Sequence, residues 1–278
     1  MNYRIVADSS SNLFRLEGAD YAAVPLKICA GDRDFMDTPD LDIGAMLDYL
    51  KGCKTKSGTS CPNPCDWMEA FGDAEMVFGV AITSRLSGCY GTGTEAAREY
   101  EASHPGARVY IHDSRSTGPE MQLLLEKLRD LQATATSFDE VQKALQEYGT
   151  HTHLLVSLES LTNLANNGRV SPLVAKMAGL LGIRIVSRAS EDGVIEPLHK
   201  CRGQKRAMQT MLDEMDKAGY RGGKVRISHC RNEEAVRILT EGLRSRYPDC
   251  DIEALDCKGL CSYYAEEGGL ILGFEDLP

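Results

Sequence analysis

Hydroxyl side chains beside predicted helix starts are the first candidates for binding chemistry. Thr59 and Ser60 lie in a predicted loop just ahead of a helix, and Ser87 and Gly88 lie between a predicted strand and the next helix. Hydroxyls and the free N–H groups of a helix start bind anions, because both donate hydrogen bonds to negative charge. Ordinary N-caps share this pattern, so the residues themselves leave both interpretations open.

A second chemistry for the same segment is nucleophilic catalysis by Ser87. The segment 84–88 lacks the Gly-x-Ser-x-Gly form of a nucleophile elbow, and none of the six histidines stands in a motif that marks it as the activating base. A serine- or cysteine-dependent hydrolase or acyl-transfer enzyme therefore stays as the alternative function. The glycines at 88–93 form neither a phosphate loop nor a complete dinucleotide fingerprint, so no nucleotide cofactor is predicted.

Thiols and one arginine are further candidates. The ten cysteines include two Cys-x-x-x-Cys pairs, Cys61/Cys65 and Cys257/Cys261. Four thiolates bind zinc, although Cys-x-x-Cys is the more typical spacing, and reduced thiols without metal are the favoured interpretation. Arg169 follows Asn167-Gly168 in a predicted turn. A guanidinium there suits a carboxylate or phosphate, while a plain surface arginine is the simpler interpretation.

Charge and hydropathy exclude several classes of protein. Among 278 residues, 31 are Lys or Arg and 41 are Asp or Glu, which gives a net charge of -10 and no basic run for nucleic acid. No run of 18 apolar residues occurs, and the first residues lack the form of a signal peptide. We therefore expect a soluble, cytoplasmic protein that neither spans a membrane nor binds nucleic acid.

The first 150 residues alternate between strand and helix patterns. Apolar runs at 3–7, 22–29, 75–82 and 108–112 are separated by helical periodicity or polar turns, which predicts an α/β unit with a largely parallel sheet. Ligands of such sheets bind at the carboxyl ends of the strands. Those ends carry Asp8-Ser9, Ser84 to Gly88 and Asp113-Ser114, where we expect the site.

The pattern changes after residue 150. Strands at 183–189 and 194–198 flank Asp192-Gly193, a strong hairpin signal because Asp-Gly accepts positive φ. Further strands (153–158, 224–229, 252–256, 269–274) and helices (204–218, 233–246) predict an α+β unit with a mixed sheet. We therefore expect two domains, 1–150 and 151–278. The apolar segment 179–183 is predicted to be core rather than a lipid channel.

The order of the motifs along the chain is more specific than any one of them. It runs Val6-Ala7-Asp8-Ser9-Ser10-Ser11, Thr59-Ser60-x-Pro62, Ile82-Thr83-Ser84-Arg85-Leu86-Ser87-Gly88-x-Tyr90, Asp113-Ser114-x-Ser116, Asn167-Gly168-Arg169-Val170-Ser171, Leu181-Gly182-Ile183-Arg184, and Asp192-Gly193 leading to Arg202. Over nearly the whole chain this series resembles the DegV family of bacterial fatty-acid-binding proteins. The resemblance implies a two-domain α/β protein with one C14 to C18 fatty acid in a tunnel between the domains.

The resemblance also implies roles for individual residues. Thr59 and Ser87 match the family's carboxylate-binding Thr and Ser, with Ser60 and Gly88 beside them, and the acyl chain would lie against the C-terminal domain. The protein would be a carrier rather than an enzyme, presenting the acid to a separate ATP-dependent kinase that makes acyl phosphate for phospholipid synthesis. Arg169 and Arg202 match basic positions and become candidates for the partner or acyl-phosphate surface.

One departure from the family concerns its Gly-Thr-His-x-Gly-Pro-Gly loop, whose His contacts the carboxylate. Ungapped counting places Tyr264 at the His, with Glu266 and Glu267 at the Gly-Pro pair, while a shifted alignment places Cys261 or Ser262 there. A Tyr hydroxyl donates to a carboxylate, but two added carboxylates would oppose an anion. The resemblance also brings the loops of Cys61/Cys65, Cys89 and Cys257/Cys261 toward the head group, so a four-thiolate zinc site is the alternative there.

Overall fold

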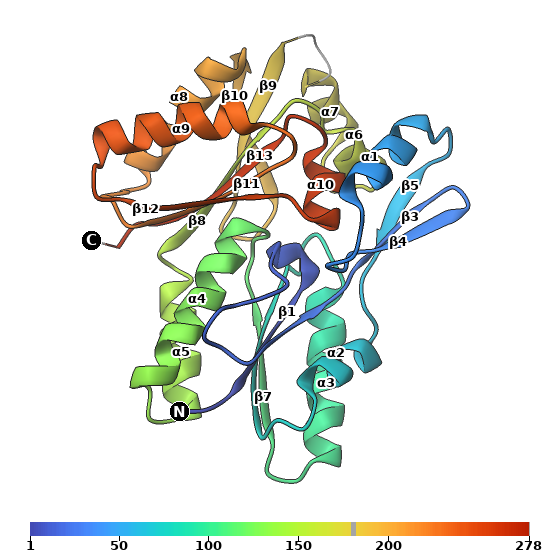
Figure 1. Ribbon diagram of the computed structural model, residues 1–278, viewed down its shortest axis with the longest axis vertical. Coiled ribbons are helices and arrows are strands. Elements are labelled where there is room, and N and C mark those ends of the chain that lie inside the picture. The colour runs from blue at the N-terminus through green and yellow to red at the C-terminus, as the bar shows by residue number, and fades with distance from the viewer. Residues whose placement is uncertain (179–181, 278) are drawn as a thin grey trace.

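The computed structural model describes residues 1–178 and 182–277, and a four-stranded parallel sheet forms its lower part (Figure 1). The order β2-β1-β6-β7 joins Tyr21–Val24, Arg4–Asp8, Met76–Ala81 and Arg108–Asp113. The central strands are apolar on both faces, as expected for parallel strands covered by helices. The helices are α2 (Pro64–Phe71), α3 (Cys89–Ser103), α4 (Pro119–Thr134) and α5 (Phe138–Tyr148). The predicted parallel α/β organisation is confirmed.

A six-stranded mixed sheet forms the upper part of the molecule. Its order is β10-β9-β8-β13-β11-β12, with bounds Ile195–Arg202, Ile183–Ala189, Thr152–Leu158, Leu270–Glu275, Lys224–His229 and Asp251–Asp256. Only the β11–β12 pair is parallel, and β9–β10 is the predicted hairpin. Helices α8 (Gln204–Lys217) and α9 (Glu233–Arg246) pack on one face through residues such as Met208 and Leu239.

A small antiparallel sheet, β4-β3-β5, was not anticipated. It joins Arg33–Met36, Lys27–Ala30 and Ser57–Ser60, with α1 (Ile43–Gly52) between β4 and β5 in the chain. The apolar run 22–29 is therefore two strands in different sheets, separated at Pro25, which has no N–H for a ladder. Thr59 and Ser60 lie on β5 rather than in a loop. Their polar segment has no alternating pattern and forms a strand only by pairing with β3.

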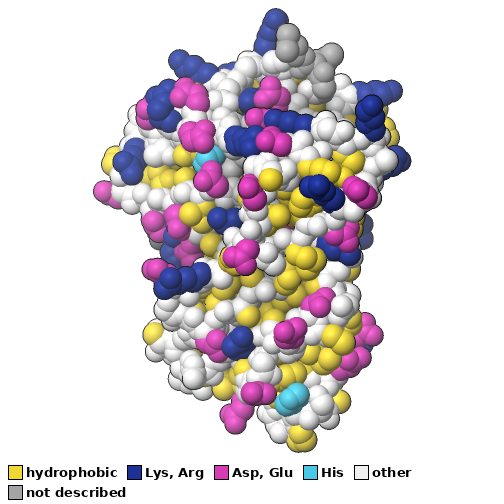
Figure 2. Space-filling model, turned by 45° about the vertical axis from the view of Figure 1, so that its right-hand side comes forward, with side chains coloured by type: hydrophobic (Ala, Val, Ile, Leu, Met, Phe, Trp, Pro, Cys, Tyr) yellow, Lys and Arg dark blue, Asp and Glu magenta, His cyan; other side chains and the backbone are white. Residues whose placement is uncertain are grey.

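The upper and lower parts meet along α4 and in a shared apolar cluster. Gly273 of β13 allows α4 to approach closely, since a Cβ there would lie 2.5 Å from the backbone nitrogen of Glu120. The shared cluster includes Ile28, Val156 and Tyr263. Around it lie α6 (Thr162–Asn166), α7 (Pro172–Ala178) and α10 (Gly259–Ala265). On the face in Figure 2, hydrophobic side chains gather between the two parts, with charged residues above and below.

Two expectations about the remaining segments have different outcomes. The predicted core segment 179–183 falls largely on residues 179–181, which lie outside the described part of the chain. No helix of the described residues is both long enough and apolar enough to cross a bilayer.

Candidate functional site

An apolar cavity with one polar end lies between the two parts of the molecule. Most of its wall is aliphatic, from Leu26, Ile82, Leu86, Val156, Leu158, Leu164, Ile195, Leu260, Ala265 and Ile271. The polar lining residues are Thr59, Ser87, Thr117, Arg169, Cys261 and Tyr264. The space between its walls, mouth included, is about 680 Å³. The mixture of apolar walls with a few polar groups is typical of a small-molecule site.

Thr59 and Tyr264 meet at the polar end. Their side-chain oxygens are 2.7 Å apart, so one hydroxyl donates to the other. Burial raises the pKa of Tyr264, and the phenol therefore keeps its proton at neutral pH. The Arg169 guanidinium lies 5.9 Å from the centre of the Tyr264 ring and donates to the backbone oxygens of Leu86 (3.0 Å) and Asn167 (2.6 Å). These bonds hold a positive charge beside the two hydroxyls.

Ser87 adds a hydroxyl directly before α3. Its Oγ donates to Cys89 Sγ at 3.1 Å and accepts from the Cys89 backbone nitrogen at 3.3 Å. Gly88 is the N-cap and has no side chain, so the N–H groups that follow Cys89 in the first turn of α3 have no side-chain cap. Gly88 also lets the Cys61 thiol approach, since a Cβ there would lie 3.1 Å from Cys61 Sγ.

Of the three strand ends where the site is expected, only one contributes residues to this cavity. The segment after β6 supplies Leu86 and Ser87 to the cavity wall. Asp8 is instead fully buried, accepts from the backbone nitrogens of Ser10 (3.1 Å) and Ile82 (2.7 Å), and has its pKa raised to about 6 by burial. Asp113 accepts from the Ser84 backbone nitrogen at 3.1 Å. These two carboxylates stabilise loops, because their oxygens accept hydrogen bonds from neighbouring backbone N–H groups.

The structure brings four of the predicted site residues to one cavity, namely Thr59, Ser87, Arg169 and Tyr264. Ser60 is exposed, and neither it nor Gly88 is among the lining residues. Arg202 is also exposed and ends β10, whereas Ile195, at the other end of that strand, lines the cavity. Seven residues of extended chain separate them by roughly 20 Å. Arg202 therefore lies away from the part of β10 that lines the cavity.

The two acidic residues after Tyr264 do not oppose an anion in the cavity. Glu266 has a φ of 54° at the end of α10, and its Oε1 accepts from the Asn163 backbone nitrogen at 3.0 Å. Glu267 pairs with Lys51 and lies 3.8 Å from Arg231. Neither lines the cavity. The predicted electrostatic opposition is wrong, because the turn directs both carboxylates toward other partners.

The thiols separate into different environments. Cys61 lies beside Gly88 and Cys65 is exposed, whereas Cys257 and Cys261 are buried in the shared apolar cluster with Cys230. Burial raises the pKa of both Cys257 and Cys261, which favours the neutral thiol. Within the described residues, no group of three or more potential metal ligands includes a cysteine. The four-thiolate alternative is therefore not supported.

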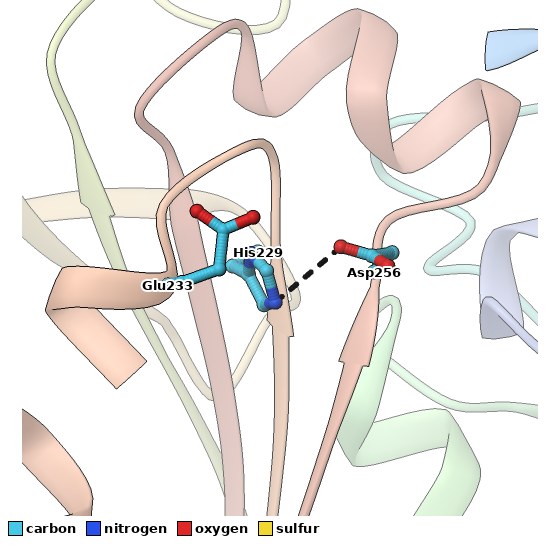
Figure 3. A group of neighbouring side chains, drawn as sticks. All are labelled: His229, Glu233 and Asp256. Atoms are coloured by element: carbon cyan, nitrogen blue, oxygen red, sulfur yellow. Dashed lines mark ion pairs between the residues drawn. The ribbon is translucent and has the colours of Figure 1, made fainter. Parts of the chain in front are cut away.

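His229, Glu233 and Asp256 form the one group of described residues with the spacing of metal ligands (Figure 3). His229 Nδ1 accepts from the Asn232 backbone nitrogen at 3.2 Å, and Nε2 lies 3.4 Å from Asp256. A neutral imidazole that accepts at Nδ1 carries its proton on Nε2. Both ring nitrogens thus face partners within the chain, and the arrangement fits a contact between imidazole and carboxylate at the end of β11 better than a cation site.

The cavity provides no base for a serine or cysteine nucleophile. Within the described residues, both hydrogen-bond partners of the Ser87 hydroxyl are atoms of Cys89, and no histidine lines the cavity. Cys261 lines it, but its raised pKa opposes formation of the thiolate nucleophile. The hydrolase alternative has no support in this geometry.

The sequence analysis missed Thr117, which precedes α4 and lines the wall. It named Cys261 and Tyr264 but did not predict the helix α10 that carries both. Helix α10 has seven residues between Lys258 and Glu266, too few for a periodic signal. The glycines at 259 and 268–269 mark its limits and were the available clue.

Comparison with known proteins finds relatives along the whole chain. The model of the family described as "Uncharacterised protein, DegV family" matches residues 2–275. A DegV domain-containing protein of Streptococcus pneumoniae is 40% identical over 279 aligned residues, which cover 99% of either chain.

Two solved structures share the fold in detail. A DegV family protein from Eubacterium eligens, loaded with heptadecanoic acid, has a TM-score of 0.97 and 42% identity over 99% of both chains. The Streptococcus pneumoniae fatty acid kinase B3 protein, loaded with linoleic acid, has a TM-score of 0.97 and 40% identity over 100% of both chains.

Proposed function

Because the chain belongs to the DegV family, we propose that it is a carrier of one long-chain fatty acid. The observation that carries the proposal is the cavity, which is aliphatic along most of its wall and has hydroxyls and one guanidinium at one end. We name Thr59, Ser87, Tyr264 and Arg169 the carboxylate site. The solved relatives hold acids of this class, heptadecanoic and linoleic acid.

The apolar wall accounts for retention of the chain. Each methylene moved from water into such a cavity contributes about 0.8 kcal/mol, so a chain of C14 to C18 gains on the order of 10 kcal/mol before its loss of freedom is counted. The chain would lie along Val156, Leu158, Ile195 and Ile271 of the six-stranded sheet.

The carboxylate site accounts for the head group. A buried carboxylate is stable only when donors and an opposite charge meet it. Thr59 and Tyr264 share one hydrogen bond, and each hydroxyl has one proton, so an entering carboxylate would accept both protons in place of that bond. Arg169 is the one charged side chain among the described lining residues.

The same arrangement supports a two-domain interpretation, with residues 1–150 and 151–278 as separate domains and the lipid tunnel between them. Thr59 and Ser87 come from the first range, and Arg169 and Tyr264 from the second. The carboxylate would therefore be held by both domains rather than by the first alone.

We further propose that the protein presents the acid to a separate ATP-dependent kinase and performs no catalysis itself. The support is a relative of 40% identity whose name includes fatty acid kinase. Since ATP is a cytoplasmic cosubstrate, the carrier would act there. Arg202, which is exposed and does not line the cavity, would contact the partner, while Arg169 would lie near the acyl phosphate.

The test combines lipid analysis with binding. Denaturing mass spectrometry of an organic extract from purified protein should yield a near-stoichiometric C14 to C18 acid. The double variant Thr59→Ala/Ser87→Ala should bind palmitate about a hundredfold or more weakly by calorimetry, since two hydrogen bonds to a charged group are lost. The matched control is Ser60→Ala, an exposed serine on the same strand. Unchanged palmitate affinity in the double variant would refute the carboxylate site.

A further inference from the structure

Helix α10 connects nearly all parts of the carboxylate site. Tyr264 bonds to Thr59, while the Tyr263 hydroxyl lies 2.8 Å from Ser57 Oγ and accepts from Asn167 Nδ2 at 3.0 Å. Tyr263 thereby ties β5, which carries Thr59, to the turn that carries Arg169. The position of one seven-residue helix thus sets the spacing between hydroxyls and guanidinium.

The start of α10 is held by two buried side chains from the first 37 residues. Asp37 accepts from the backbone nitrogens of Gly259 at 2.7 Å and Leu260 at 3.0 Å. Asn12 accepts from the Lys258 nitrogen at 2.6 Å. Asp37 and Asn12 are 0% and 1% exposed, so water does not compete for these bonds. The helix start is therefore fixed to the N-terminal part of the chain.

The packing around this contact leaves little room for the helix to shift. A Cβ on Gly259 would lie 2.6 Å from Asp37 Oδ1 and 2.7 Å from Leu41 Cδ2, so glycine permits the close approach. The Asp37 backbone nitrogen donates to the oxygen of Leu26, and Leu26 lines the cavity. Asp37 therefore links the cavity wall and the start of α10 directly.

We propose that Asp37 is a positioning residue for fatty-acid binding, which holds α10 so that the Tyr264 hydroxyl meets the carboxylate beside Thr59. This inference rests on the proposed function. Two N–H bonds to one carboxylate define both the place and the direction of a short helix, and Tyr264 follows only five residues after Gly259. Loss of one bond lets the helix turn, which displaces the phenol from the carboxylate.

The test separates positioning from ordinary helix capping by using two ligands with the same chain. Palmitate has the carboxylate, and methyl palmitate lacks its charge. In Asp37→Asn, the amide oxygen still accepts from one of the two helix N–H groups, but the amide nitrogen cannot accept from the other. We expect its palmitate affinity to fall about tenfold while its methyl palmitate affinity stays within about twofold. An equal fall for both ligands would mean general loosening of the cavity and would overturn the proposal.

The matched control is Asp42→Asn. Asp42 caps α1 by accepting from the Ala45 backbone nitrogen at 2.9 Å, and α1 carries no described lining residue. This variant should leave both affinities unchanged. If Asp37→Asn does not fold, Asp37→Ser replaces it under the same criteria, because a serine hydroxyl still accepts from a helix start.

A double-mutant cycle with Tyr264→Phe shows whether Asp37 acts through the phenol. In a protein that already carries Tyr264→Phe, the further change Asp37→Asn should alter palmitate affinity by less than about twofold. If the double variant loses palmitate affinity by the product of the two single-variant losses, the two residues act independently and the proposal is contradicted. Failure of the unmodified protein to bind palmitate would refute the proposed function itself, an outcome distinct from both results.

Discussion

Two polar clusters join the parallel sheet to the six-stranded sheet, and they differ in how fully their hydrogen-bonding groups are used. The interface ion network centres on Arg226 of β11 and Glu126 of α4, each 6% exposed in its side chain. Arg226 Nε and Nη2 donate to the two Glu126 oxygens at 2.7 and 2.8 Å, and Nη2 also donates to Asp251 at 2.9 Å. Its donors are occupied by partners within the chain.

The carboxylate site, in contrast, retains unused donor capacity at the end of an apolar cavity. Thr59 and Tyr264 carry two hydroxyl protons but share only one hydrogen bond, and Gly88 gives α3 no side-chain cap. A network whose hydrogen-bonding groups are all used cannot bind a ligand through them. Unused donors beside apolar walls can bind an anion that also has an apolar chain. The comparison distinguishes a cluster that stabilises the fold from one that binds.

Breaking the interface ion network should have the largest effect. Arg226→Met removes the nearest cation of the buried Glu126 carboxylate and leaves it only Gln122 at 3.1 Å and Lys224 at 3.7 Å, and we expect the free energy of unfolding to fall by about 3 kcal/mol. Chemical denaturation measures this loss. The control is Arg237→Met, whose solvent-exposed pairs with Glu234 and Glu241 are screened by water and contribute little to stability. Equal losses of stability in the two variants would show that the interface ion network stabilises the fold no more than exposed ion pairs do.

Glu120 of α4 is a buried carboxylate with no cation partner among the described residues, in contrast to Glu126 on the same helix. Glu120 accepts from Ser116 and Thr152, and burial raises its pKa from 4.5 to about 7. The folded chain thus keeps a proton that the unfolded chain releases between pH 4.5 and 7. The stability from this group is fully present below pH 4.5 and is lost as pH rises through 7, roughly 2–3 kcal/mol in all.

The measurement for Glu120 is denaturation of wild type and Glu120→Gln at pH 4.5 and 7.5. Glutamine does not ionise. The free energy of unfolding of Glu120→Gln relative to wild type should therefore be roughly 2–3 kcal/mol higher at pH 7.5 than at pH 4.5. Asp8 and the other titrating groups remain in both proteins and cancel. A difference that is independent of pH would show that Glu120 ionises normally in the fold.

Removing the positive charge of the carboxylate site should affect binding more than stability. Arg169→Met keeps a long side chain but loses the charge, and palmitate affinity should fall about 10- to 100-fold, or roughly 1.5–3 kcal/mol. Calorimetry with palmitate measures it. Arg202→Met is the control, because Arg202 lies outside the cavity and its loss should leave palmitate affinity unchanged. Similar losses of palmitate affinity in both variants would show that the positive charge acts at long range and not by contact with the carboxylate.

The smallest expected effect is that of one hydroxyl. Ser87→Ala removes one donor while Thr59, Tyr264 and the start of α3 remain, so palmitate affinity should fall about 3- to 10-fold. The same titration with Ser60→Ala should give the wild-type value. A hundredfold loss in Ser87→Ala would instead assign this serine the dominant role in the carboxylate site.

Much of the fold could be predicted from local patterns. The alternation in the first half, the Asp192-Gly193 hairpin and the helices that cover the mixed sheet all carry short-range signals, and all are found. The β4-β3-β5 sheet could not be predicted, because Ser57–Ser60 is polar and becomes a strand only opposite β3. Four of the proposed site residues share the cavity, while Gly88, Ser60 and Arg202 do not line it.

The chemistry available to this protein follows from its amino-acid sequence: hydroxyls near helix starts, an arginine in a turn, an acidic surface and an ordered series of motifs that marks the family. Which of these groups meet depends on tertiary packing. Thr59 and Tyr264 are 205 positions apart, and Asp37 reaches the start of α10 across 222 positions. Such contacts arise from the packing of the two sheets, so no local spacing encodes them. The same packing turned Glu266 and Glu267 away from the cavity and kept the cysteine pairs apart.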